Sequence, residues 1–254
     1  MNESMKNIMP ASFLIAIIAA IIYLIFFTND VYSEGKIKMI EIKNNRLLSA
    51  EDYFAFTSMN DLSPLDEIPL PIIKTRFTKH PYVEHADVLR NGLENLEINL
   101  TEKNVVAVIL DKGNSYFITD EFQVLPVLTN TQLMTFPLIN NLKRLKEIKP
   151  FTTYKTEEMI EAFRIIEAAK LADENISSKL SEINFRNGGD IILTFSGIEC
   201  PVIFGRGEEA KKMVYLEIMW NGLIDSKNIL KESDYIDLRF SKEIYVAKNT
   251  GIGG

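Results

Sequence analysis

His80 and His85, with Glu84 between them, are the side chains in this sequence whose types could ligate a metal ion. The inverted zinc motif needs H-x-x-E-H on one helix, so that both imidazoles lie on the same face. Here the spacing is H-x-x-x-E-H, and Pro81 interrupts any helix between the two histidines. The sequence therefore predicts no metal site here, and it predicts that both histidines lie on the surface at a corner between a helix and a strand.

A glycine-flanked arginine, Gly205-Arg206-Gly207, precedes a helical pattern that contains Lys211 and Lys212. A phosphate-binding loop would need G-x-x-x-x-G-K-[ST] after a strand, and this segment departs from that pattern. It is predicted to be a flexible turn that leads into a helix cap. No cofactor is expected.

Cys200 is the only cysteine, so an internal disulfide and a cysteine-ligated zinc site are both excluded. The apolar residues around it, from Ile198 to Phe204, predict a strand with a buried structural thiol. The sequence has no G-x-S-x-G motif and no readable Cys–His pair. Its acidic residues show no spacing typical of paired catalytic carboxylates. These residues predict a body that binds other molecules and does not catalyse a reaction.

The composition is that of an acidic, folded protein. The chain has 254 residues, 46% of them hydrophobic, and a formal net charge of −7. This charge argues against nucleic acid as a partner and provides no basic patch for lipid headgroups. Beyond the first thirty or so residues, enough sequence remains for one large or two small domains.

An uncharged apolar run extends from Ala11 to Phe27. Counted from Ile8, it is long enough for a helix of about 30 Å, which matches the hydrocarbon thickness of a bilayer. Residues 26–29 offer no small-x-small cleavage site, and the run is apolar on every face. The sequence therefore favours an uncleaved membrane anchor over a signal peptide or a buried core helix.

The orientation of this anchor does not follow from charge alone. Lys6 lies on one side of the run, and Lys36 and Lys38 lie on the other, so the positive-inside rule favours neither direction. The default expectation is a cytoplasmic tail at residues 1–10, an anchor at 11–28 and an extracytoplasmic body.

The region 36–106 shows the pattern β-α-α-β-β. A strand over 38–42 comes first, and Ser49 stands where a capping serine would begin the first helix. Apolar residues at i, i+3 and i+7 from Leu70 predict a second helix, which stops before Pro81. Two half-buried strands follow around the turn Asn91-Gly92, with Ala86, Val88 and Arg90 alternating on the first and Leu96, Ile98 and Leu100 on the second.

The region 107–248 predicts a second, strand-rich α+β module, and 249–254 a disordered glycine-rich tail. One helix is expected to begin at a Thr156 cap, and another to run from Glu208 to Leu223. The second helix is expected to place Val214, Ile218 and Met219 on one face. The expected strands cover 105–110, 115–119, 180–185, 191–195, 200–204, 236–240 and 244–246.

Three stretches, in this order, resemble the FtsQ/DivIB family of bacterial division proteins. The first comprises 47–51, 73–77 and 80–88, and it is similar to the family's POTRA module, in which a helix ends in a Pro-Xaa-Val step before a strand. The second, 96–107, is similar to the crossing between the family's two modules. The third, 235–240, resembles the "iDLRf" strand near the family's C-terminus.

The resemblance implies an α+β protein with a single N-terminal transmembrane helix, a POTRA domain at 36–106 and a β domain at 107–248. It implies a non-enzymatic scaffold of the divisome, in the inner (plasma) membrane at the division septum, with its body in the periplasm or extracytoplasmic space. The expected partners are FtsB/DivIC-like and FtsL-like division proteins, which would control septal peptidoglycan synthesis. No nucleic acid, metal or small-molecule substrate is expected. Val105 and Phe122 depart from the family's usual proline and turn glycine, so the resemblance does not define the loop geometry at these two positions.

The alternative is a membrane-anchored extracytoplasmic enzyme or a cell-wall ligand-binding protein. An enzyme should have a pocket in which polar groups and acids with shifted pKa values converge. A scaffold should instead have an exposed sheet edge and no such pocket.

The resemblance places partner contacts on the C-terminal strands, where an extended partner segment would add a strand to an open edge. The candidates there are Arg239, Phe240, Ser241, Ile244, Tyr245 and Val246. Arg239 would contact an acidic partner residue, and Phe240 and Tyr245 would be aromatic anchors. The alternative for Phe240 is a core position, because it alternates with Ile236 and Leu238. In the first module the candidates are Asp87 and Arg90, with plain solvent-facing positions as the alternative.

Overall fold

A computed structural model describes residues 17–23, 37–61, 68–92, 94–132, 135–143, 147–224, 233–240 and 243–248. Of the predicted anchor, only 17–23 fall within this set, and they form a helix with exposed side chains. The rest of the anchor, the tail at 1–10 and the tail at 249–254 lie outside the described residues. Among the described helices, none combines the length and the apolar character needed to cross a bilayer.

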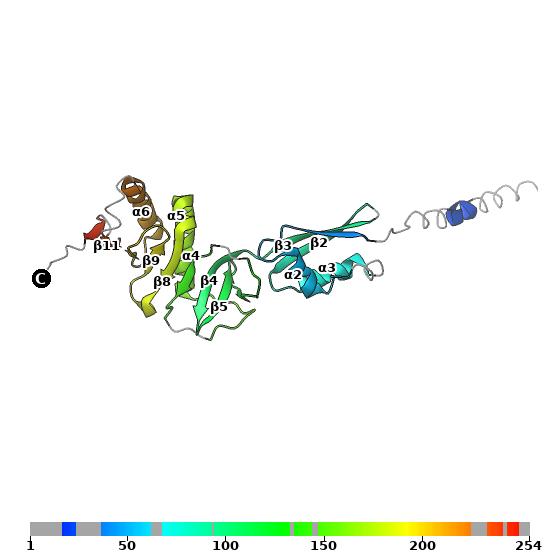
Figure 1. Ribbon diagram of the computed structural model, residues 1–254, viewed down its shortest axis with the longest axis horizontal. Coiled ribbons are helices and arrows are strands. Elements are labelled where there is room, and N and C mark those ends of the chain that lie inside the picture. The colour runs from blue at the N-terminus through cyan, green and yellow to red at the C-terminus, as the bar shows by residue number, and fades with distance from the viewer. Residues whose placement is uncertain are drawn as a thin grey trace, which may run out of the picture.

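The first module has the element order β-α-α-β-β that the sequence predicts. Its elements are β1 (Met39–Lys43), α2 (Ala50–Thr57), α3 (Leu70–Thr78), β2 (Val83–Asn91) and β3 (Asn95–Glu102). The three strands form one sheet in the order β1-β3-β2, in which β1 runs parallel and β2 antiparallel to β3. Figure 1 shows α2 and α3 together on one face of this sheet.

Local sequence signals explain these elements. The Ser49 hydroxyl accepts the backbone N–H of Asp52 at 3.2 Å, which is the capping contact that starts α2. α3 follows Pro69 and carries Pro71 in its first turn, where the missing N–H costs nothing. The strands alternate, so that the inward residues of β3 are buried.

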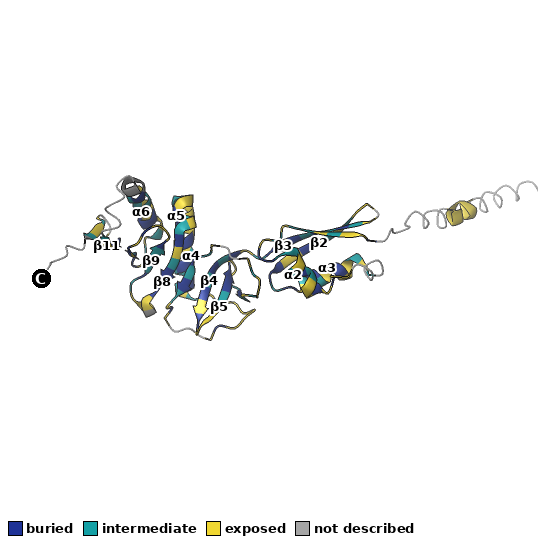
Figure 2. Cartoon of the chain, viewed as in Figure 1, coloured by how far each residue is buried: buried dark blue, intermediate teal, exposed yellow. Residues whose placement is uncertain are grey.

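The second module is built on a nine-stranded sheet in the order β12-β11-β10-β9-β8-β7-β4-β5-β6. The pairs β4–β7, β7–β8 and β10–β11 are parallel, and the other pairs are antiparallel. Buried residues run through its strands and through the helices packed on them (Figure 2). Its elements are β4 (Val105–Asp111), β5 (Asn114–Thr119), β6 (Val124–Pro126), β7 (Leu138–Asn140), α4 (Glu157–Ala172), α5 (Glu174–Lys179), β8 (Leu180–Asn184), a 3-10 turn (Arg186–Gly188), β9 (Ile192–Phe195), β10 (Val202–Ile203), α6 (Glu209–Ile224), β11 (Ser233–Asp237) and β12 (Tyr245–Lys248).

The predicted apolar face of α6 holds only at Met219, which packs against the core of the second module. Val214 and Ile218 are 42% and 65% exposed, whereas Met213, Leu216 and Trp220 are buried. The helix is apolar around much of its circumference, so spacing alone could not select the buried stripe. The Trp220 indole decides the rotation of the helix, because it packs edge-on against Phe195 of β9 with ring centroids 5.5 Å apart.

The prediction of two surface histidines is half wrong. His85 is exposed, as predicted, but His80 is only 2% exposed. The chain turns inward after α3, and the His80 ring lies against the rings of Tyr53, Phe56 and Tyr82. The spacing of polar residues gave no sign of this inward turn.

The two modules lie end to end along the long axis of the molecule (Figure 1). Only residues 103 and 104 separate β3 from β4. One residue each of β4, β5 and β6 of the nine-stranded sheet, namely Val105, Phe117 and Leu125, is buried in the hydrophobic core of the first module. The modules are therefore joined by shared packing as well as by the chain.

Candidate functional site at the C-terminal sheet edge

β12 is the outermost strand at one end of the nine-stranded sheet. It pairs antiparallel with β11, so that Val246 lies opposite Ile236 and Tyr245 opposite Asp237. No strand among the described residues pairs with the outer side of β12. An unpaired strand edge presents N–H and C=O groups to which another chain can hydrogen-bond.

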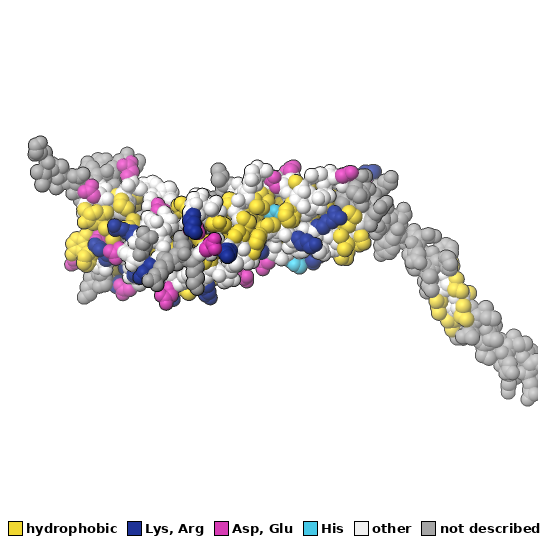
Figure 3. Space-filling model, turned by 90° about the horizontal axis from the view of Figure 1, so that it is seen from below, with side chains coloured by type: hydrophobic (Ala, Val, Ile, Leu, Met, Phe, Trp, Pro, Cys, Tyr) yellow, Lys and Arg dark blue, Asp and Glu magenta, His cyan; other side chains and the backbone are white. Residues whose placement is uncertain are grey.

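An aromatic pair lies beside this edge. Phe240 and Tyr245 are 51% and 49% exposed, and their rings meet edge to face with centroids 5.0 Å apart. The Tyr245 hydroxyl donates a hydrogen bond to Glu243, which raises the pKa of Tyr245. Figure 3 shows hydrophobic side chains on the surface at this end of the molecule.

The alternative core position for Phe240 is wrong. Ile236 and Leu238 are buried as the alternation predicts, but Asp237 between them is buried too, and Phe240 is exposed. β11 ends at Asp237, so the two-residue period stops there. The chain beyond this residue turns Phe240 toward Tyr245.

Arg239 is held by two carboxylates of its own chain. Its Nε and Nη2 donate to Asp237, with distances of 3.0 Å and 2.6 Å, and its Nη1 donates to Asp190 at 2.8 Å. The hydrogen bonds from Arg239 lower the pKa of Asp237, and those to Asp237 and Asp190 raise the pKa of Arg239. The guanidinium thus joins the end of β11 to the hairpin between β8 and β9.

The loop before α6 supports the Arg239 side chain. Gly205 adopts a φ of +65°, and a Cβ built on it would lie 2.8 Å from Arg239 Cγ. In the same loop, the backbone carbonyl of Arg206 accepts a hydrogen bond from Nζ of the buried Lys212 at 3.0 Å. Burial lowers the pKa of Lys212, against the influence of nearby carboxylates. The aliphatic part of the Arg239 side chain therefore packs against Gly205, in a loop that a hydrogen bond from the buried Lys212 holds in place.

The remaining C-terminal candidates divide into two groups. Ile244 is partly buried and packs against the core of the second module. Val246 lies opposite the buried Ile236 on β11, but it is itself 36% exposed. Ser241 lies outside the described residues. Arg239, Phe240 and Tyr245 are the candidates that the structure brings together.

Asp87 and Arg90 lie far from this edge, on β2 at the border of the three-stranded sheet (Figure 1). Asp87 is exposed and accepts hydrogen bonds from Lys74 at 3.0 Å and from His85 at 3.2 Å. The bond from Lys74 is the main cause that lowers the pKa of Asp87. Arg90 is half-buried on the same face as Ala86. These two residues therefore belong to opposite faces of β2.

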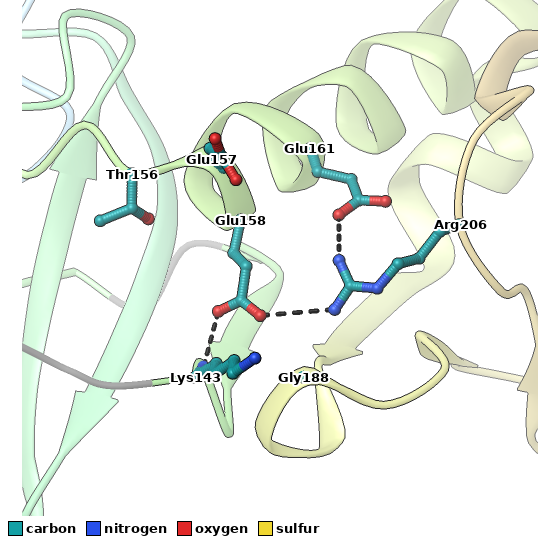
Figure 4. A pocket seen from close by; sticks show the side chains of 7 residues that line it. All are labelled: Lys143, Thr156, Glu157, Glu158, Glu161, Gly188 and Arg206. Atoms are coloured by element: carbon teal, nitrogen blue, oxygen red, sulfur yellow. Dashed lines mark hydrogen bonds and ion pairs between the residues drawn. The ribbon is translucent and has the colours of Figure 1, made fainter.

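A polar cleft of about 470 Å³ lies where the loop before α6 meets the first turns of α4 (Figure 4). Arg206 points into it and forms ion pairs with Glu158 and Glu161, and Glu158 also accepts the backbone N–H of Lys143 at 2.6 Å. Burial raises the pKa of Glu161, and Arg206 opposes this shift. This cleft has the converging polar groups and the acid with a raised pKa that the enzyme alternative requires. Glu158 and Glu161 are nevertheless bound by groups of the same chain, and these bonds join α4 to the loop before α6.

The sequence did not single out the residues that position Arg239. Asp237 could have been found, because it stands two residues before Arg239 on the same stretch of chain. Asp190 is 49 residues away from Arg239 in the sequence, and Gly205 and Lys212 belong to another loop and helix. No local spacing predicts those contacts.

The fold is that of a two-module α+β protein, and among its described residues no strand pairs with the outer side of β12. A family model described as "Cell division protein FtsQ/DivIB, C-terminal" matches residues 101–239, which is more than half of the sequence. The chain belongs to the FtsQ/DivIB family of cell division proteins.

Curated relatives agree with this family. A protein named "Cell division protein FtsQ" from Geotalea daltonii is 23% identical over 213 residues, which cover 84% of this chain and 76% of the relative. A protein of the same name from a Geobacter species is 24% identical over 214 residues, with the same two coverages. Another, from Syntrophotalea carbinolica, is 24% identical over 227 residues, or 89% of this chain and 77% of the relative.

Proposed function

We propose that this protein is a non-enzymatic scaffold of the bacterial divisome, anchored once in the inner membrane with its N-terminus in the cytoplasm. In this proposal the first module is a POTRA domain, and the second module binds FtsB/DivIC-like and FtsL-like partners at the septum. The open edge of β12 carries the proposal, because a partner segment that adds a strand there would gain main-chain hydrogen bonds.

Phe240 and Tyr245 would supply the side-chain contacts. Exposed aromatic residues at the centre of an interface contribute much of its binding energy. Arg239 would add a directed contact. Its bonds to Asp237 and Asp190 engage Nε, Nη1 and Nη2, and the guanidinium has a second N–H on each Nη. A partner carboxylate would bind there, on a side chain that its own chain already holds in position.

The edge can be tested with the variant Phe240→Glu/Tyr245→Glu. We expect co-purification of the FtsB/FtsL-type partner to fall at least about tenfold, since each lost aromatic anchor costs about 1–2 kcal/mol. The melting temperature should stay the same, because both side chains are exposed. A matched control is Phe151→Glu/Leu171→Glu, which changes two exposed hydrophobic residues elsewhere in the same module. Equal capture by the two variants would rule this interface out.

The predicted topology has its own test. Protease added to spheroplasts should digest the body if residues 8–28 cross the inner membrane and the rest is extracytoplasmic. A protected body, or a mature N-terminus beyond residue 28, would contradict this topology. Such a result would not bear on the proposed role of the β12 edge in partner binding, which the aromatic variant tests separately.

A further inference from the structure

The corner between α3 and β2 reaches across the junction into the second module. Tyr82, at this corner, is fully buried. Its hydroxyl donates to the carbonyl of Pro126 at 2.9 Å and accepts the backbone N–H of Leu128 at 2.8 Å, and it lies 3.0 Å from the Thr131 hydroxyl. All three partners belong to the second module, so a single phenol connects the segment after β6 to the first module.

Other contacts close the same junction. The Tyr82 ring lies against Phe117 of β5, with centroids 5.8 Å apart. The backbone N–H of Gln132 donates to the carbonyl of Leu47 at 2.8 Å, and the Asn130 amide donates to Asp52 at 2.9 Å. The segment that follows β6 is therefore bound to the first module over several residues.

His80 holds the corner itself. The backbone N–H of Tyr82 donates to His80 Nδ1 at 3.1 Å, so this nitrogen carries no proton. The imidazole is enclosed by Tyr53 and Phe56 of α2 and by the Tyr82 ring. The titratable groups around it are Tyr53 and Tyr82, with Glu102 of β3 one hydrogen bond further through the Tyr53 hydroxyl.

Protonation would break this arrangement. An imidazolium carries N–H on both nitrogens, so Nδ1 could no longer accept the Tyr82 N–H, and two donors would face each other at 3.1 Å. The charge would also lie among aromatic rings, away from water. We propose that the corner at 79–82 is an acid-sensitive lock between the two modules: it is closed while His80 is neutral, and protonation of His80 releases the second module from the first.

The electrostatics of the site set the range in which the lock opens. Burial lowers the pKa of His80 from 6.5 to about 4. In a released corner the imidazole would be hydrated and would bind a proton more readily, so acid favours the open form. The lock is closed at neutral pH and should open as the pH falls from about 6.5 toward 4.

The lock can be tested by measuring distances between two spin labels by electron double resonance. The full-length chain in detergent, with Cys200→Ala, would carry cysteines in place of Thr75 on α3 and Arg164 on α4, both of which are exposed. We expect a narrow distance distribution at pH 7.5. At pH 4 it should be at least twofold broader, while far-UV circular dichroism is unchanged.

Two variants assign the effect to the corner. His80→Asn places a non-titrating amide oxygen close to the position of Nδ1, so its distribution should stay narrow at pH 4. In the control His85→Asn, which changes the exposed histidine, the distance distribution should broaden at pH 4 as it does in the parent. Tyr82→Phe removes the three hydroxyl contacts and should broaden the distribution already at pH 7.5.

The proposal is overturned if the distance distribution of the parent protein stays narrow at pH 4. It is also overturned if the distribution of His80→Asn broadens at pH 4 as much as that of the parent. A narrow distribution for Tyr82→Phe at pH 7.5 also overturns it, and this result is available even where His80→Asn does not fold. These measurements need no partner protein, so their outcome is independent of the proposed role in the divisome.

Discussion

Glu102, at the end of β3, shows how one buried carboxylate can organise a loop. It accepts the Tyr53 hydroxyl at 2.5 Å and the backbone N–H groups of Arg46 and Leu47 at 2.9 Å and 3.1 Å. A buried charge is tolerated only when such donors surround it. The carboxylate therefore fixes the segment between β1 and α2 against the sheet.

Tyr53→Phe removes one of these donors and leaves Glu102 buried. We expect the free energy of unfolding to fall by about 1–3 kcal/mol, because the carboxylate is then incompletely hydrogen-bonded. Urea denaturation at pH 7 measures this change. The control Tyr235→Phe alters a partly exposed tyrosine on β11, and it should stay within about 0.5 kcal/mol of the parent. Equal stability of the two variants would contradict this account of Glu102.

At the scale of elements, the loop before α6 contains a matched pair of glycines. Gly205 and Gly207 have φ values of +65° and +70°, so a Cβ at either position is strained. Only at Gly205 would it also meet Arg239, since nothing lies within 4 Å of a Cβ at Gly207. Comparing substitutions at the two glycines therefore separates the effect of backbone strain from the effect of losing the contact with Arg239.

We expect Gly205→Ala and Gly207→Ala each to lower stability by about 1 kcal/mol, the cost of a left-handed alanine. Gly205→Ala should also displace the Arg239 stem. The NMR signal of the Arg239 Nε–H, which is bonded to Asp237, should shift in that variant and stay in place in Gly207→Ala. If Arg239 supports partner binding as proposed, capture should weaken only in Gly205→Ala. An unchanged Nε–H signal in both variants would show that the contact with Gly205 does not position Arg239.

At the scale of the whole molecule, His80 links stability to pH. Its folded pKa of about 4 lies below the ordinary value of 6.5, so between these values the unfolded chain binds more protons. Stability is therefore complete above about pH 6.5 and is lost as the pH falls toward 4. The difference corresponds to at most roughly 3 kcal/mol, at 1.36 kcal/mol per pKa unit.

Chemical denaturation at a series of pH values should show this loss in the parent chain and in the control His85→Asn. In His80→Asn the slope between pH 6.5 and 4 should be reduced, because no imidazole has to be buried neutral. Carboxylates with lowered pKa values, such as Asp237, change the stability at lower pH, and their contribution is the same in every variant. Parallel curves for the parent and His80→Asn would refute this role of His80.

Local signals were sufficient for much of the fold. The Ser49 cap and the alternation along β3 act within a few residues, so the order β-α-α-β-β could be predicted from the sequence. The three-residue strands β6 and β7 could not, since such short strands are defined by their neighbours in the sheet. Deviations arose where tertiary contacts decide, as Trp220 does for the rotation of α6 and Tyr82 for the burial of His80.

The candidate site was predictable only in part. Exposed aromatic residues near a last strand could be proposed, but the strand end at Asp237, which exposes Phe240, could not. The contact of Arg239 with Asp190 joins segments far apart in the chain. The family resemblance and the charge of Arg239 suggested a contact with a partner, and the structure shows that its own chain already holds this side chain.

The parallel pairing of β1 with β3 has a mechanical consequence. Residues Met39 to Lys43 lie beside Asn95 to Asn99 in the same direction, and the chain leaves β3 toward the second module at the end opposite the start of β1. Tension between the N-terminal side of β1 and the second module would load this ladder in shear, so that its hydrogen bonds resist together. The antiparallel β2–β3 hairpin, pulled from its own ends, would unzip one pair at a time. Under a pull along this direction, the β1–β3 ladder would therefore resist separation better than a hairpin pulled from its own ends.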